Sequence, residues 1–232
     1  MASKLYATHV PTSLFEKAAL SVDASVRALA NPRRADLVGV LGETTGALAL
    51  RRMRERMARD TVGRSILAER PRIRAHTVSA AALSALPAGS FGNAYGTFLD
   101  RHAFDPDDRA DVRFVDDEEL AYVMTRYRET HDLWHVLFGL PPTVLGEVAL
   151  KCIEAVQTGL PMCAAGALFG GARVRFAQTA RLARVLPWAA RAGSRAADLM
   201  CVRYEDHLGE PLVELRAILR VDACPPDLGG VG

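Results

Sequence analysis

Two histidines and two acids near the middle of the chain constrain its fold most strongly. His131, Asp132 and His135 fall within five residues, and eleven residues separate His135 from Glu147. On a helix each residue advances by about 100°, so the histidines lie one turn apart. Asp132 lies within the same third of the circumference. All three side chains can therefore reach one ion.

The segment after these histidines predicts a turn that returns the chain. Gly139-Leu-Pro-Pro142 must end the helix, and Thr143 is a good N-cap for a second helix with Glu147 in its first turns. A fourth ligand then arrives from the neighbouring helix. The sequence thus predicts a metal site between two consecutive antiparallel helices.

The composition favours an all-α protein. The chain has 232 residues, half of them hydrophobic, which suffices for one domain or at most two. Aromatic residues make up only 6%, and alternation typical of strands is scarce. Because no internal repeat or flexible linker is visible, we predict a single compact helical domain over 1–232, with a core at 5–219 and a mobile tail at 220–232.

Individual helices follow from apolar periodicity and from turn residues. A short helix from Asp36 is expected to break at Gly42–Gly46, and a later helix is expected to be interrupted at Pro187. Further helices are expected over 13–30, 47–59, 61–69, 77–85, 90–102, 116–138, 143–158 and 211–219, with two or three more across 162–200.

The cluster of titratable groups favours a bound cation over a purely hydrogen-bonded arrangement, because burying such groups together is costly unless something binds them. Two neutral imidazoles with one or two carboxylates suit zinc, manganese, iron(II) or cobalt, and they leave positions open for water or substrate. The pattern resembles the H-E-x-x-H of zinc proteases, but the shorter Asp132 stands where those enzymes have glutamate. This difference argues against a protease.

Two cations accompany the cluster. Arg128 lies three residues before His131 and either faces an anionic substrate group or pairs with Asp132 at i+4. Lys151, one turn beyond Glu147, offers a second cation.

The net charge of +2 gives no strong bias towards nucleic acid, and no nucleic-acid partner is expected. Nine arginines fall within 51–74 and eight acids within 105–119. These runs are either solvated surface or, for the basic run, a contact with anionic lipid or an acidic partner. The segment 179–200 is likewise either a core helix with an arginine face or an interfacial helix with Leu186 and Trp188 in the membrane.

The compartment is constrained only weakly. Four cysteines show no C-x-x-C pairing, which favours a reducing environment. The chain has no run of about 20 apolar residues that could cross a membrane. Met1–Leu20 lacks the features of a secretory signal or of a mitochondrial presequence.

Several ordered motifs resemble the Coq4 family of ubiquinone biosynthesis proteins, from about Leu5 to Leu219. They are Leu41-Gly-Glu-Thr-Thr-Gly46, Glu69-Arg-Pro-Arg-Ile73, Leu86-Pro-Ala-Gly89, Arg113-Phe-Val-Asp-Asp-Glu-Glu-Leu-Ala-Tyr-Val-Met124, the H-D-x-x-H-x11-E signature and Glu154-Ala-Val-Gln-Thr-Gly-Leu-Pro-Met162.

The resemblance implies an all-helical protein with a divalent metal, usually zinc, held by His131, Asp132, His135 and Glu147 as the metal-binding and catalytic residues. It implies action at C1 of a polyprenylated 4-hydroxybenzoate, where the carboxylate is removed and a hydroxyl is installed in current views. It also implies a homodimer that organises other ubiquinone biosynthesis proteins at the matrix face of the mitochondrial inner membrane, or at the cytoplasmic face in a bacterium. Two hypotheses follow: a metal-dependent C1 decarboxylase, or a non-catalytic lipid-binding scaffold protein.

Overall fold

The computed structural model describes residues 4–30, 35–171, 174 and 176–231, and its regular elements there are all helical. Strand-like pairing within these residues is limited to an isolated bridge between Ser90 and Pro211. The predicted all-α class is confirmed. The α-helices are α1 (Leu14–Ala30), α2 (Ala35–Thr45), α3 (Ala47–Arg59), α4 (Thr61–Glu69), α5 (Ala80–Ser84), α6 (Phe91–His102), α7 (Glu118–Phe138), α8 (Val144–Thr158), α9 (Pro161–Gly170), α10 (Thr179–Arg195) and α11 (Leu212–Ile218).

Short 3-10 helices complete the described chain. They are η1 (Pro106–Asp108), η3 (Phe176–Gln178), η4 (Leu199–Cys201), η5 (Tyr204–His207) and η6 (Pro226–Leu228).

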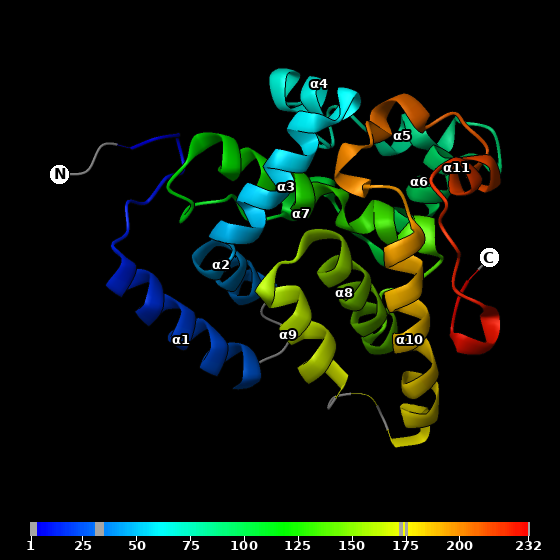
Figure 1. Ribbon diagram of the computed structural model, residues 1–232. Helices are drawn as coiled ribbons and strands as arrows, with labels where there is room; N and C mark the ends of the chain where they lie inside the picture. The colour runs from blue at the N-terminus through cyan, green and yellow to red at the C-terminus, as the bar shows by residue number, and fades with distance from the viewer. Residues whose placement is uncertain (1–3, 31–34, 172–173, 175, 232) are drawn as a thin grey trace.

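The helix α7 runs through the middle of the molecule and carries both histidines (Figure 1). It packs against α3, α4 and α6, and most of its side chains are buried, with Trp134, Leu137 and Phe138 fully inaccessible. Asp117 caps its first turn by accepting a hydrogen bond from the backbone N–H of Leu120. The histidines therefore project from a rigid core element.

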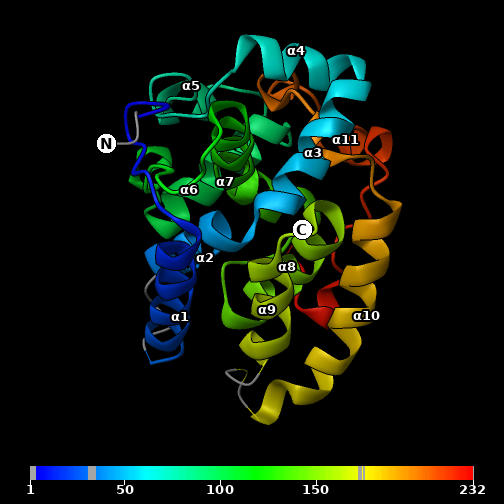
Figure 2. The same ribbon diagram turned by 60° about the vertical axis from the view of Figure 1, so that its left-hand side comes forward.

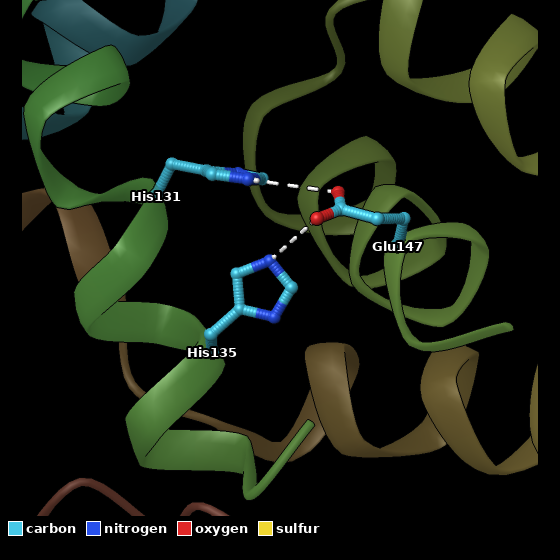
Figure 3. A group of neighbouring side chains, drawn as sticks. All are labelled: His131, His135 and Glu147. Carbon is cyan, nitrogen blue, oxygen red and sulfur yellow. Dashed lines mark hydrogen bonds and ion pairs between the residues drawn. The ribbon is translucent and has the colours of Figure 1, made fainter. Parts of the chain in front are cut away.

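The next helix, α8, carries Glu147 and packs mainly against α9 and α10 (Figure 2). Gly139 ends α7 in the left-handed conformation, and the side chain of Thr143 caps α8. Figure 3 shows α8 nearly end-on beside α7, so the two helices cross steeply. The predicted antiparallel arrangement is wrong, because the intervening prolines turn the chain away from α7 instead of back along it.

The break predicted at Gly42–Gly46 is confirmed only at Gly46, since α2 ends at Thr45 and α3 begins at Ala47. Gly42 lies inside α2 and serves close packing, because a Cβ there would collide with the side chains of Met124 and Met162. The interruption predicted at Pro187 is wrong. The helix α10 continues through Pro187. The neighbouring Trp188 is buried, and its ring meets that of Phe138 edge-on at 6.5 Å. The segment is therefore a core helix and not an interfacial one.

The C-terminal segment, expected to be a mobile tail, packs against the end of α7. The amide of Cys224 donates to the carbonyl of Phe138 at 2.7 Å, and that of Val231 donates to the carbonyl of Gly139 at 2.8 Å. The side chain of Leu228 is buried. A helix end leaves carbonyls without partners inside the helix, and this segment supplies them with donors.

The basic and acidic runs of the sequence contact one another. Arginines from the first run form ion pairs with acids from the second, namely Arg54 with Glu119 at 2.5 Å, Arg70 with Glu118 at 2.6 Å and Arg74 with Asp111 at 3.3 Å. Part of the basic charge is thus already matched within the chain.

The four cysteines are free thiols. Among the residues described, the structure contains no helix with the length and apolar character needed to cross a membrane.

A chain that ends at Asp222 should be less stable than the full chain. Removing the later residues exposes the pocket of Leu228 and leaves the carbonyls of Phe138 and Gly139 unpaired, so the free energy of unfolding should fall by at least about 2 kcal/mol in a urea titration. The control Asp227→Ala removes only an exposed pair with Arg184 and should change it by less than about 0.5 kcal/mol. Equal stability of the truncated and full chains would contradict this expectation and favour the mobile tail that the sequence predicts.

Candidate metal centre

Three predicted ligands converge at the junction of α7 and α8. His131 and His135 point from consecutive turns of α7 towards Glu147 of α8 (Figure 3). One ligand atom from each residue lies within 4.8 Å of the others. We call these three residues the metal centre.

Both imidazoles present the same nitrogen to the carboxylate. The Nε2 atom of His135 lies 3.1 Å from Glu147 Oε1, and that of His131 lies 3.7 Å from Oε2. The opposite nitrogens are also engaged: His135 Nδ1 lies 2.9 Å from the carbonyl oxygen of Leu140, and His131 Nδ1 lies 2.7 Å from Glu154 Oε1. Every ring nitrogen thus faces an oxygen that accepts hydrogen bonds.

This arrangement fits a cation. A neutral imidazole has one N–H and one lone pair, so a ring between two acceptors must gain a second proton or turn its lone pair towards a carboxylate. If both Nδ1 atoms carry the proton, both Nε2 lone pairs point into the space beside Glu147. A divalent ion there removes the conflict, and two nitrogens with a carboxylate form a donor set that suits zinc, iron(II), cobalt or manganese.

The electrostatics of the centre favour its charged forms. Burial opposes the ionised forms of both Glu147 and His135, but their mutual hydrogen bond and charges outweigh it. The pKa of Glu147 is lowered to about 2, and the pKa of His135 is raised. The Glu147 side chain is 40% exposed, so the centre opens to solvent on that side.

The buried carboxylate of Glu154, which was not among the predicted site residues, holds the ring of His131. Glu154 is fully inaccessible and lies two turns beyond Glu147 on α8. Its second oxygen accepts a hydrogen bond from Lys151 Nζ at 2.5 Å. Burial raises the pKa of Glu154, but the charges of Lys151 and His131 lower it well below its usual range. The spacing of seven residues between Glu147 and Glu154 was a visible signal, because it places both acids on one helix face.

Neighbouring side chains complete the surroundings of this carboxylate. Lys151 also lies 3.3 Å from the hydroxyl of Tyr127, which lies 3.1 Å from the sulfur of Cys163. Burial raises the pKa of the Cys163 thiol to about 12, so the thiol remains protonated. The cation that the sequence predicted at Lys151 thus balances the charge of Glu154.

An aromatic wall lies against the second histidine. Phe98 of α6 stacks on His135, with ring centroids 5.5 Å apart and an interplanar angle of 23°. This contact and the Leu140 carbonyl fix the orientation of the ring.

The fourth predicted ligand lies outside this group. Asp132 is hydrogen-bonded to Arg109, a residue of the loop between α6 and α7 that the sequence reading had not singled out. The predicted alternative in which Arg128 pairs with Asp132 is wrong, since Arg128 pairs with the buried Glu43 at 2.6 Å. No helical periodicity connects Arg109 to the motif, so nothing in the sequence pattern could have revealed its contact with Asp132.

Replacing Glu154 by glutamine should weaken metal binding. Glu154→Gln removes the charge that holds the His131 ring and its tautomer, so zinc affinity should fall roughly 10- to 100-fold in a competition titration with a chromophoric chelator. Glu43→Gln is the matched control, because Glu43 is equally buried and paired with a cation but lies outside the centre. An equal loss in both variants would contradict a specific role for Glu154.

Comparisons with known proteins agree on one family. The family model described as coenzyme Q (ubiquinone) biosynthesis protein Coq4 matches residues 6–225. Mitochondrial ubiquinone biosynthesis protein COQ4 homologues share 48% identity in Xenopus tropicalis and 49% in Danio rerio, each over 97% of this chain and over 80% and 83% of the relative. The homologue of Rattus norvegicus shares 47% over 98% of this chain and 86% of its own length.

A solved structure confirms the fold at greater distance. The crystal structure of a candidate ubiquinone biosynthesis protein of Nostoc punctiforme superposes with a TM-score of 0.71 at 20% identity, covering 89% of this chain and 99% of that one.

Proposed function

This chain belongs to the Coq4 family of coenzyme Q (ubiquinone) biosynthesis proteins, and we propose that it is a metal-dependent decarboxylase of a polyprenylated 4-hydroxy-3-methoxybenzoate. The family resemblance inferred from the motifs is confirmed. The proposal rests on one observation above all: the Nε2 atoms of His131 and His135 and the carboxylate of Glu147 face one point.

The proposed chemistry requires a site for charge that develops at C1. The three ligands that converge in the structure leave positions open for Asp132 and for substrate. When bound, a divalent metal supplies a Lewis acid that stabilises the negative charge left as CO2 departs. Glu154 and Leu140 hold the two imidazoles, and the partial exposure of Glu147 leaves an approach for the substrate.

Two outcomes at C1 are chemically distinct. In simple decarboxylation the bond from C1 to the carboxylate breaks, its electron pair stays on C1, and a proton replaces CO2. In the oxidative form a hydroxyl replaces CO2, which requires an oxidant such as dioxygen. Because zinc has no redox chemistry, the oxidative form requires iron, manganese or cobalt, or a substrate that itself reacts with oxygen.

We include Asp132 as a fourth ligand in this proposal. It follows His131 directly on α7 and shares that side of the helix. Its contact with Arg109 must then change when a metal ion binds.

We further propose that the protein acts at a membrane surface, since its substrate carries a lipid tail. Large apolar side chains are exposed around the end of α9 and in η3, with Leu168 at 75%, Phe169 at 64% and Phe176 at 93%. The relatives are named mitochondrial, which supports a mitochondrial location. Within it we propose the matrix face of the inner membrane, or the cytoplasmic face of the membrane if the chain is bacterial. The proposed partners there are other ubiquinone biosynthesis proteins and a second copy of this chain.

Labelled substrate tests the activity directly. The metal-loaded protein should release labelled CO2 from a prenylated 4-hydroxy-3-methoxybenzoate that is labelled at the carboxyl carbon, and His135→Ala should release none because the centre has lost a ligand. The control His76→Ala alters an exposed histidine far from the motif in sequence and should retain release. Absence of release with zinc, cobalt, manganese or iron, in the presence of oxygen, would contradict the enzyme.

The alternative function is a non-catalytic lipid-binding scaffold, favoured by the same exposed apolar side chains. Glu147→Gln separates the two functions, because this partly exposed residue contributes a ligand but little to the core. The enzyme proposal expects normal folding and normal binding to partner proteins, with product formation reduced at least about 100-fold. Product formation at the normal rate would favour the scaffold.

A further inference from the structure

Three arginines line a small cavity beside α7, and one of them contacts Asp132, the residue after the first histidine of the metal centre. They are Arg74, Arg109 and Arg128, and they share the cavity with Asp111 and Glu129. Arginine is the side chain best shaped to bind a carboxylate, because its planar fork matches both oxygens. The acid that balances each arginine decides whether it is free to bind a ligand.

Two of these arginines are matched by acids that have no predicted part in the metal centre. Arg128 pairs with the buried Glu43 at 2.6 Å. Arg74 lies 3.3 Å from both Glu129 and Asp111. Their charges are balanced whether or not a metal ion is present.

Arg109 differs, because its carboxylate partner is the predicted metal ligand. Its Nη2 atom donates to Asp132 Oδ2, and its Nη1 atom donates to the carbonyl of Pro106 at 3.1 Å. The two side chains are only 17% and 13% exposed. The Pro106 contact holds the guanidinium in place from the loop side, independently of Asp132.

A buried hydroxyl with poor hydrogen bonding lies near Arg109 and Asp132. Among the described residues, the Tyr95 hydroxyl makes no hydrogen bond of good geometry. Burial raises its pKa to about 12, although the charge of Arg109 and a weak hydrogen bond from its guanidinium act in the opposite direction. A buried polar group with poor hydrogen bonds is costly. A carboxylate bound by Arg109 would supply an acceptor for this hydroxyl.

We propose that Arg109 is the residue that binds the substrate carboxylate. In the absence of metal Asp132 pairs with Arg109, and when a metal ion binds, Asp132 leaves Arg109 to ligate the ion. The inference rests on the proposed function, since it takes the metal centre as given. Once Asp132 turns to the ion, the mostly buried guanidinium of Arg109 has lost the acid that it pairs with among the described residues, which is strongly unfavourable. An aromatic carboxylate restores the pair.

This exchange couples the two ligands. Metal binding exposes the carboxylate site, so each ligand raises the affinity for the other by the same factor. Without metal, Asp132 excludes the substrate from Arg109. The protein thereby avoids binding a substrate that it cannot convert.

Calorimetric titrations with zinc and with 4-hydroxybenzoate, a soluble probe of the carboxylate, test the coupling. Wild-type protein should bind the probe roughly tenfold more tightly with zinc than without it. In Arg109→Gln, zinc should bind more tightly because its competitor for Asp132 is gone, whereas the zinc-loaded variant should bind the probe roughly tenfold more weakly than zinc-loaded wild type. A merely structural residue would not change the two affinities in opposite directions.

A second variant tests Arg109 in the absence of metal. Asp132→Asn removes the competing charge, so this variant should bind 4-hydroxybenzoate without zinc roughly tenfold more tightly than wild type does. Arg74→Gln is the matched control, because it lines the same cavity while Glu129 keeps its pair with Arg72. It should leave zinc affinity unchanged.

The outcomes separate this inference from the proposed function. Wild-type protein that binds no zinc would contradict the proposed metal centre and the coupling together. Zinc binding with unchanged zinc and probe affinities in Arg109→Gln would overturn only the role of Arg109. If that variant fails to fold, unchanged probe affinity in metal-free Asp132→Asn overturns the inference, and tighter binding supports it.

Discussion

The buried carboxylate of Glu154 is the interaction on which the centre depends. It has no access to solvent, and a charge in such a place is tolerated only when partners surround it. His131 of α7 and Lys151 of α8 provide those partners. Both contacts stabilise the buried charge. The contact with His131 also joins α7 to α8 and orients the first histidine. Stability and ligand geometry are therefore set by one group.

The steep crossing of α7 and α8 makes this connection necessary. The main helical neighbours of α8 are α9 and α10, whereas α7 packs on α3, α4 and α6. Helices that cross in this way meet over a small area, so side chains near the crossing determine how the two helices are oriented relative to each other. The end of α7 is held separately, by the C-terminal segment and by Arg216, which donates to the carbonyls of Val136 and Leu137. The turn between the two helices is thus fixed from both sides.

The sequence predicted what depends on local periodicity and missed what depends on distant contacts. An i,i+4 spacing places His131 and His135 on one face in any α-helix, and this prediction is confirmed. The interruption predicted at Pro187 is wrong, because packing of the buried face of α10 outweighs a local preference. The partner of Asp132 lies 23 residues earlier in an irregular loop, where no periodic pattern could indicate it. The single-domain boundaries stay a prediction.

The charges around the centre are consistent with a carboxylate substrate. With neutral histidines, the acids Asp132, Glu147 and Glu154 outnumber the cations Arg109 and Lys151 by one. A divalent ion would reverse the excess to one positive charge, and one substrate carboxylate would then neutralise it. Charge in a mostly buried site is costly, so a metal-loaded centre would favour a monoanion over a neutral ring. In the proposed decarboxylation, loss of CO2 would remove that anion, and the product would lack the attraction that held the substrate.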